Sequence, residues 1–151
     1  MKIFFAFFIL FLTTNVNAEL LKPSPEYLPK DVISIQLSAL KVNDSPYSNA
    51  GIEQTWEFAH PMNKKFTGPL SNFINMMNSP SYIIMLDHKK HNIILVNIEN
   101  NIAYFFVELI DKNGSKFGFQ WALEKVLEEN ELKNCWMTIS VSSPFQLSNS
   151  A

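Results

Sequence analysis

The strongest candidate for chemistry in this chain is Glu108, a single carboxylate in the otherwise apolar segment 102–111. Because side chains alternate along a strand, Glu108 shares one face with Ile102, Tyr104, Phe106 and Ile110. A carboxylate desolvated on such a face has a raised pKa, which suits proton transfer, and Tyr104 could hydrogen-bond a ligand oxygen. The pattern predicts an acid–base site if this face lines a pocket. If the face meets solvent, Glu108 is a salt-bridged surface residue.

The three histidines offer weaker candidates. His60 follows a predicted helix, where it can interact with the last carbonyls or, since imidazole titrates near neutral pH, act as a base. His88 and His91 flank two lysines beside Asp87. Two imidazoles and a carboxylate can bind a metal, but the lysines would repel the cation and no third histidine is near. We therefore expect an exposed hairpin tip at 87–90, no metal site and no cofactor.

Cys135 is the only cysteine, so the chain forms no internal disulfide. The apolar residues that alternate with it are Met137, Ile139 and Val141. This pattern predicts a buried, inert thiol instead of a nucleophile. A second alternating set, Phe117, Phe119 and Trp121, indicates core or a subunit interface more than a stacking platform for bases.

Helix signals occupy the first half of the chain. Asp31 is a capping residue for a helix that ends near 43–44, with Ile33, Leu37 and Leu40 on one face. A second helix fits 52–59, and a third begins at Gly68-Pro69 and closes before Pro80. The segment between them, 60–67, is predicted to be a solvated connector in which Phe66, with Phe73 in the third helix, anchors the core.

Strand signals follow, over 82–86, 93–99, 102–111, 116–125 and 135–141, with an Asn-Gly hairpin signal at 113–114. Helices first and strands second predict an α+β fold, with three N-terminal helices on a curved antiparallel sheet of four or five strands. Segment 102–111 is apolar on both faces and must be covered twice. A second subunit could cover one of them, which predicts a homodimer.

Composition limits the classes of partner. The chain is 47% hydrophobic and 17% charged, its net charge is -2, and all twelve basic residues are lysine. A nucleic-acid surface needs clustered positive charge, and arginine is the usual bidentate phosphate clamp, so nucleic acid is not an expected partner.

Both ends of the chain have sequence patterns that differ from those of the domain between them. Lys2, an apolar run over 3–12 and small residues at 16 and 18 predict a signal peptide, 1–18, cleaved after Ala18. We expect an exported protein, periplasmic or secreted, or in the secretory pathway of a eukaryotic host, with no membrane attachment after cleavage. Prolines predict an extended linker over 19–29. A single α+β domain then covers 30–142, and 143–151 forms a loose tail.

Four motifs carry a family resemblance: DVISIQLSALKVND at 31–44, WEFAHP at 56–61, FTGP at 66–69 and CWMT at 135–138. In this order, over roughly 29–141, they resemble the uncharacterised family called domain of unknown function 4864. That family is similar in fold to the nuclear-transport-factor-2-like superfamily, whose members lean helices on a curved antiparallel sheet around a cone-shaped pocket. The superfamily contains isomerases, dehydratases, ligand binders and interaction modules, so the resemblance implies a fold and no single activity.

Three functions remain open from the sequence. The favoured one is a non-catalytic module that binds an apolar small molecule or a protein, with Trp56, Phe58 and Phe106 as candidate pocket residues. The alternative is a cofactor-independent acid–base enzyme of the isomerase or dehydratase type, using Glu108, Tyr104 and His60. The second alternative is a structural homodimer whose cone is filled by side chains.

Overall fold

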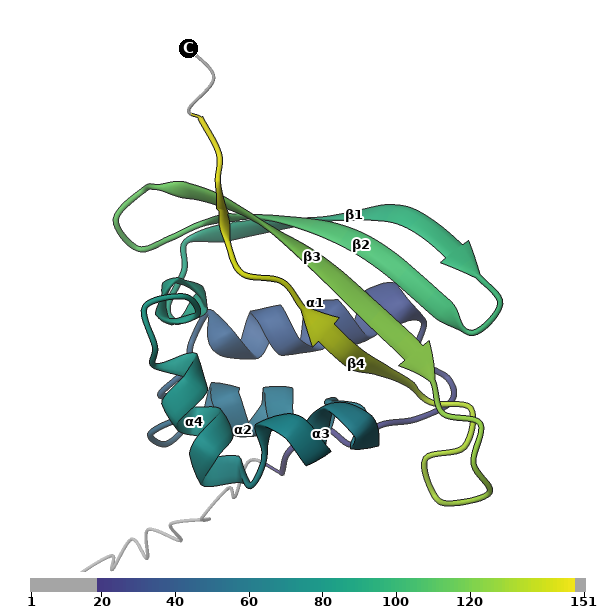
Figure 1. Ribbon diagram of the computed structural model, residues 1–151. Coiled ribbons are helices and arrows are strands. Elements are labelled where there is room, and N and C mark those ends of the chain that lie inside the picture. The colour runs from purple at the N-terminus through teal and green to yellow at the C-terminus, as the bar shows by residue number, and fades with distance from the viewer. Residues whose placement is uncertain (1–18, 149–151) are drawn as a thin grey trace, which may run out of the picture.

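The computed structural model describes residues 19–148, and in these residues helices precede strands, as the sequence predicts. The fold is α+β: the helices lie against one face of a twisted antiparallel sheet (Figure 1). The predicted signal peptide and the end of the predicted tail, 149–151, lie outside the described residues. The helices are α1 (Pro29–Leu40), α2 (Ala50–Glu57), α3 (Pro61–Thr67) and α4 (Leu70–Met77), followed by a 3-10 helix, η1 (Ile83–Met85).

Helix α1 begins at Pro29, ahead of the predicted cap Asp31, and ends at Leu40 instead of near 43–44. Pro29 occupies the first turn, where its missing N–H is not needed. Asp31 is also in the first turn, and its carboxylate accepts a hydrogen bond of 2.9 Å from the Leu28 N–H. The predicted apolar face is confirmed, since Ile33, Leu37 and Leu40 are fully buried.

The prediction of a connector at 60–67 is wrong, because α3 occupies most of it. Pro61, which follows the predicted helix 52–59 and lies in the predicted connector, is the first residue of α3. The His60 ring supplies the cap, since its Nδ1 accepts a hydrogen bond of 3.1 Å from the Met62 N–H. Residues 19–148 therefore contain four α-helices before the sheet instead of the predicted three. Phe73 is buried in the core as predicted, but Phe66 is 84% exposed.

The prediction of a strand at 82–86 is also wrong, since η1 lies there. A short apolar run has no periodicity that separates strand from helix. The segment 19–28, which is the predicted extended linker 19–29 without Pro29, runs beside α2. The Leu21 N–H donates to Gln54 Oε1 at 2.8 Å, and Gln54 Nε2 donates to the Leu21 carbonyl at 2.9 Å.

The sheet has the order β1-β2-β3-β4, with all neighbours antiparallel. Asn100 and Gly114, with φ of 53° and 88°, take the left-handed conformations that the two tight hairpins need. A fifth short strand pairs with the first half of β3, where the sequence predicted a loose tail. The strands are β1 (Lys90–Glu99), β2 (Ile102–Ile110), β3 (Lys116–Lys125), β4 (Trp136–Val141) and β5 (Phe145–Gln146).

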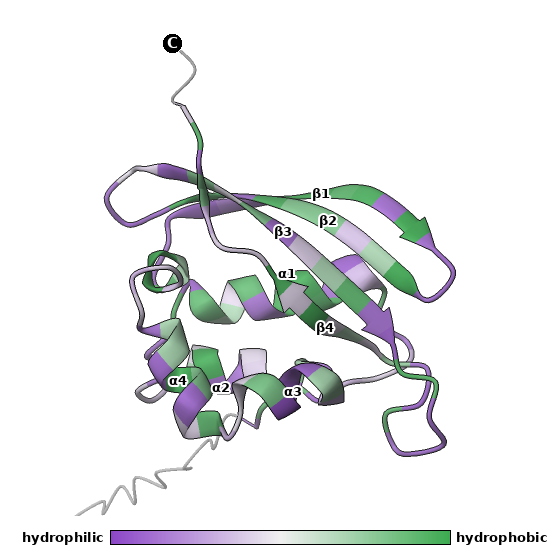
Figure 2. Ribbon diagram, viewed as in Figure 1, coloured by the Kyte–Doolittle hydropathy of each residue, from purple (hydrophilic) through white to green (hydrophobic). Residues whose placement is uncertain are grey.

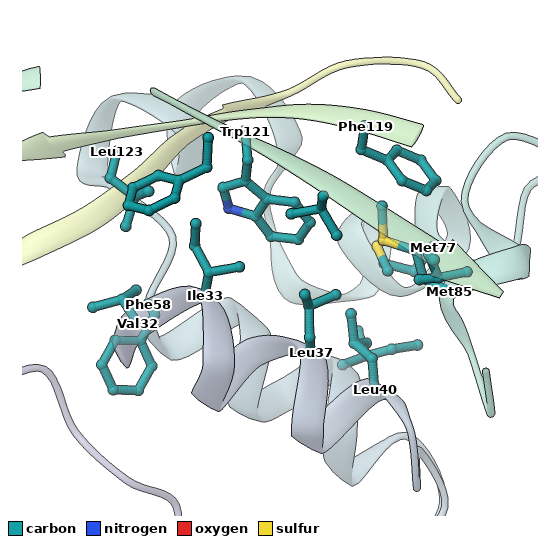
Figure 3. Close-up of a cluster of buried hydrophobic side chains, with 14 of the residues drawn as sticks. Val32, Ile33, Leu37, Leu40, Phe58, Met77, Met85, Phe119, Trp121 and Leu123 are labelled. Carbon is teal, nitrogen blue, oxygen red and sulfur yellow. The ribbon is translucent and has the colours of Figure 1, made fainter. Parts of the chain in front are cut away.

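The core lies between α1 and the sheet. Ile33 and Leu37 of α1 point toward Trp121 and Leu123 of β3 (Figure 3). In β2 the residues buried toward the helices are Ala103, Phe105, Val107 and Leu109. The alternate set, which contains Glu108, lies on the outer face, over which no helix packs within residues 19–148 (Figure 1).

The two edges of the sheet differ. At the β4 edge the Thr138 N–H donates to the Phe58 carbonyl and the His60 N–H donates to the Thr138 carbonyl, both at 2.8 Å. The link between α2 and α3 therefore pairs with β4 as a short parallel bridge at Ala59. Strand β1 pairs with β2 alone among the described residues. The sheet is thus open at β1, and a cone-shaped enclosure stays a prediction.

Candidate ligand pocket

A cavity of about 300 Å³ lies between the helices and the β3–β4 side of the sheet. Its volume is at the lower end of the range for small-molecule sites. None of its lining residues carries a charge. They are Gln36 and Leu40; Thr55, Ala59, Asn63, Phe66 and Thr67; Phe73, Met76, Met77, Tyr82 and Met85; and Trp121, Thr138, Ile139, Ser140 and Val141.

Helix α4 forms one wall because its apolar residues recur at helical spacing. Phe73 and Met77 are buried on one face, and Met76 beside them is half-buried. The turn from α3 to α4 depends on Gly68, where an added Cβ would lie 2.6 Å from the Lys64 carbonyl oxygen and 2.9 Å from the Trp56 ring. The absence of a side chain at this position lets α4 fold back over Trp56 and bring its apolar face to the cavity.

The floor of the cavity is a chain of buried hydrogen bonds. Trp121 Nε1 donates to Thr138 Oγ1 at 3.1 Å, and Thr138 Oγ1 donates to Gln36 Oε1 at 2.7 Å. Gln36 Nε2 donates in turn to the Thr55 carbonyl at 3.1 Å. A hydroxyl and an amide oxygen each accept through two lone pairs, so Thr138 Oγ1 and Gln36 Oε1 can each take one more donor. The floor can therefore orient a single polar group of a ligand.

The mouth of the cavity is formed by α3. Phe66 is 84% exposed there, an unusual position for a phenylalanine. Asn63 fastens α3 to the sheet edge, because its Nδ2 donates to the Thr138 carbonyl at 3.3 Å. The rim thus combines a fixed backbone with an exposed aromatic side chain.

The predicted acid–base pair lies on the other face of the sheet. Glu108 Oε2 accepts a hydrogen bond of 3.3 Å from Asn92 Nδ2, and Glu108 Oε1 lies 3.8 Å from Lys116 Nζ. Tyr104 is 42% exposed on the same outer face. Glu108 is therefore a salt-bridged, partly solvated carboxylate, which is the surface interpretation left open by the sequence. The acid–base hypothesis loses the carboxylate on which it depended.

None of the three predicted aromatic pocket residues lines the cavity. Phe58 is fully buried in the core, with its ring 6.0 Å from that of Tyr27. Trp56 is half-buried behind the pocket wall, 5.0 Å from the Phe73 ring. Phe106 lies on the outer face across Gly118, where an added Cβ would meet its ring at 2.3 Å.

His60 lies beside the cavity and does not line it. Burial lowers the pKa of His60, against the weaker opposing effect of Glu124 and Glu128. The neutral ring is the form that can accept from the Met62 N–H. His60 therefore acts as a helix cap, and no described contact makes it a base.

The exposed hairpin tip predicted around His88 is wrong, because His88 is 2% exposed. His88 Nδ1 lies 2.7 Å from the Met85 carbonyl, and His88 Nε2 lies 2.7 Å from His91 Nδ1. A carbonyl only accepts, so the His88 proton is on Nδ1 and the bare Nε2 accepts from His91. Burial lowers the pKa of both rings. Within residues 19–148 no three potential ligand side chains gather around a metal position.

Cys135 is buried as predicted, and burial raises the pKa of its thiol, which disfavours a nucleophile. It packs with Val126 and Met137 in a small second core. The predicted alternation ends at a β-bulge, because Leu123 pairs with Thr138 and Ala122 pairs with Ser140. Ile139 is the extra residue, and it joins the cavity wall.

Sequence reasoning missed the residues that build this pocket, chiefly Gln36, Met76 and Thr138. Gln36 carried a usable signal, since it is a polar residue beside the apolar stripe of α1 and is 1% exposed. Thr138 and Met76 carried no such signal. The position of Thr138 depends on the bulge in β4, and that of Met76 depends on the approach of α4.

No helix within residues 19–148 combines the length and apolarity needed to cross a membrane. An α+β arrangement of this kind is common to many families. Comparisons with protein-family models, with curated proteins and with solved structures return no match to this chain.

Proposed function

We propose that this chain is an exported binding module for a small, neutral, largely apolar molecule that occupies the cavity beneath α3 and α4. The observation that carries the proposal is the cavity of about 300 Å³ with no charged residue in its lining. Export is proposed from the N-terminal sequence pattern.

Binding accounts for the cavity better than catalysis does. The lining contains hydroxyls, amides, an indole and thioethers, but no carboxylate, imidazole or thiol. General acid–base catalysis needs a group that titrates near the working pH. Glu108, the predicted source of such a group, lies on the outer face of the sheet.

The floor defines the polar part of the ligand. Gln36 and Thr138 are held in place by each other, by Trp121 and by the Thr55 carbonyl. A ligand hydroxyl or N–H that reaches these two side chains exchanges its hydrogen bond to water for one to the protein. A charged group would lose its hydration without gaining a counter-ion. The proposed ligand class is therefore a compact apolar molecule with one hydrogen-bond donor, such as a small alcohol, phenol or amide.

A neutral fluorescent probe, N-phenyl-1-naphthylamine, tests the site. We expect its fluorescence to rise on binding and to be displaced by small phenols. Met76→Trp fills the cavity from α4 and should weaken probe binding by about tenfold or more, because the apolar area that the probe buries is lost. Met62→Trp is the matched control, since Met62 lies on α3, is 45% exposed and does not line the cavity.

The proposal fails if Met76→Trp binds the probe as tightly as the unaltered chain, or if both tryptophan variants weaken binding equally. Glu108→Gln should leave probe binding unchanged. A large loss of binding would instead indicate that the probe binds at the outer face of the sheet. Native mass spectrometry of gently purified protein supplies an independent readout. We expect a small neutral molecule to co-purify with the chain and to be absent from Met76→Trp.

A further inference from the structure

Strand β1 is an open and apolar sheet edge. It is ten residues long and pairs only with β2 within residues 19–148. Its free side has no ribbon beside it (Figure 1), and much of its length is coloured as hydrophobic (Figure 2). Four of its side chains are large, apolar and exposed: Ile94 at 40%, Leu95 at 53%, Val96 at 65% and Ile98 at 48%. An edge of this kind is a template for another strand.

A bulge sets which side chains of β1 share a face. Leu95 pairs with Phe105 and Asn97 pairs with Tyr104, so Val96 is the extra residue. Past the bulge the alternation shifts by one residue. The side chains on the outer face are, in order, Lys90, Asn92, Ile94, Asn97 and Glu99.

The outer-face side chains of β1 are complementary to those of a second β1 strand that runs in the opposite direction. If two β1 strands run antiparallel with Ile94 opposite Ile94, then Asn92 lies opposite Asn97 of the second copy. Lys90 lies opposite Glu99 of the second copy, and the same pair recurs at the other end. On the inner face the register places Ile93 against Leu95. Within residues 19–148 neither Lys90 nor Glu99 forms an ion pair of its own.

We propose that two copies of this chain associate through β1, in antiparallel register about a two-fold axis at Ile94. The two sheets then form one continuous sheet across the pair. The opposite charges at the two ends of β1 favour this orientation, because parallel pairing would place Lys90 against Lys90. The interface is isologous and closes on itself, so it covers both open edges without leaving a free one.

Charge reversal tests the register of the two β1 strands as well as the association of the two copies. In the chain expressed from Met1, sedimentation velocity should show a concentration-dependent dimer. Lys90→Glu and Glu99→Lys each create two like-charged contacts, and each should weaken dimerisation by about tenfold. The double variant Lys90→Glu/Glu99→Lys restores both pairs with reversed polarity and should return dimerisation close to its original strength.

Ile94→Lys tests the axis itself. It brings two ammonium groups together at the centre of the interface, and we expect a monomer at all accessible concentrations. Ile94 is exposed, so the variant should keep its fold, which circular dichroism checks. Lys65→Glu and Glu131→Lys are the matched controls, because they make the same charge changes at exposed positions outside β1 and should leave the dimer intact.

Three outcomes would overturn the proposal. The first is an unaltered chain that is monomeric at high concentration. The second is a dimer that survives Ile94→Lys, which would place the interface elsewhere. The third is a double charge variant that is no stronger than the single variants, which would exclude this register.

Discussion

The two edges of the sheet meet different surroundings within the same fold. At the β4 edge, backbone groups of Phe58 and His60 hydrogen-bond to Thr138, and α3 and α4 build a cavity over the strand. At the β1 edge, no described segment lies beside the strand, and its apolar side chains stay exposed. Within residues 19–148 the chain itself completes the first edge and leaves the second open. Ligand binding is therefore proposed at the closed edge and association at the open one.

The largest test of this difference compares truncations at the two edges. Phe58→Ala removes a fully buried ring that lies where the chain pairs with β4, and should lower the free energy of unfolding by about 3–5 kcal/mol. Leu95→Ala, at the open edge, should cost less than about 1 kcal/mol, because Leu95 is 53% exposed. Urea unfolding of dilute protein measures both without a contribution from association. Equal losses would contradict the distinction between the edges.

A smaller effect is expected from the buried floor of the cavity. Thr138→Val keeps the shape of the side chain but leaves Trp121 Nε1 without its acceptor and Gln36 Oε1 without a donor. The expected loss is about 2 kcal/mol in the free energy of unfolding. Thr67→Val is the matched control, since its hydroxyl donates to the Asn63 carbonyl in a part-buried setting. A control loss as large as that of Thr138→Val would show that burial of the network is not decisive.

The pH dependence of stability should involve both edges, because His60 lies at one and His88 with His91 at the start of the other. Burial lowers the pKa of each ring below its unfolded value of about 6.5. Above that pH both states are neutral and the rings contribute nothing. As pH falls below about 6.5 the unfolded chain binds protons that the folded chain does not, so stability is lost.

Charged groups near His88 and His91 have smaller, opposing effects on the pKa of His88. Lys41 lowers this pKa and Asp87 raises it. His60→Asn keeps a capping side chain at the β4 edge without a titrating ring. Denaturation between pH 7 and pH 5 should show a shallower loss for His60→Asn than for the unaltered chain. An unchanged slope would assign the dependence to His88 and His91 alone.

The sequence was sufficient for the parts of the fold that depend on local pattern. The apolar spacing of 33, 37 and 40, the helix start at Gly68-Pro69 and the Asn-Gly turn each point to one structure, and each was confirmed. Helix α3 was missed because it is short, has no buried residue and starts at a proline that is also a common terminator. Histidine is not among the preferred capping residues, so His60 gave no start signal.

The site could not be predicted for a different reason. Strand β2 is apolar on both faces, so alternation groups Glu108 with Tyr104 but does not say which face the helices cover. That choice is made by contacts between α1 and the sheet, which are distant in sequence. The cavity likewise depends on the bulge at Ile139 and on the approach of α4, and neither leaves a local pattern.

His60 also has a consequence for how the protein opens. Its backbone N–H is bound to Thr138 while its ring caps α3, so one residue joins the sheet edge to the first turn of that helix. A helix of seven residues without a buried side chain has little stability of its own. Helix α3 and strand β4 should therefore exchange their amide hydrogens as one cooperative unit, although His60 and Thr138 lie 78 positions apart in the sequence. Local unfolding of that unit would open the cavity on the side of α3 and β4 while α1 and the β1–β2 hairpin stay folded.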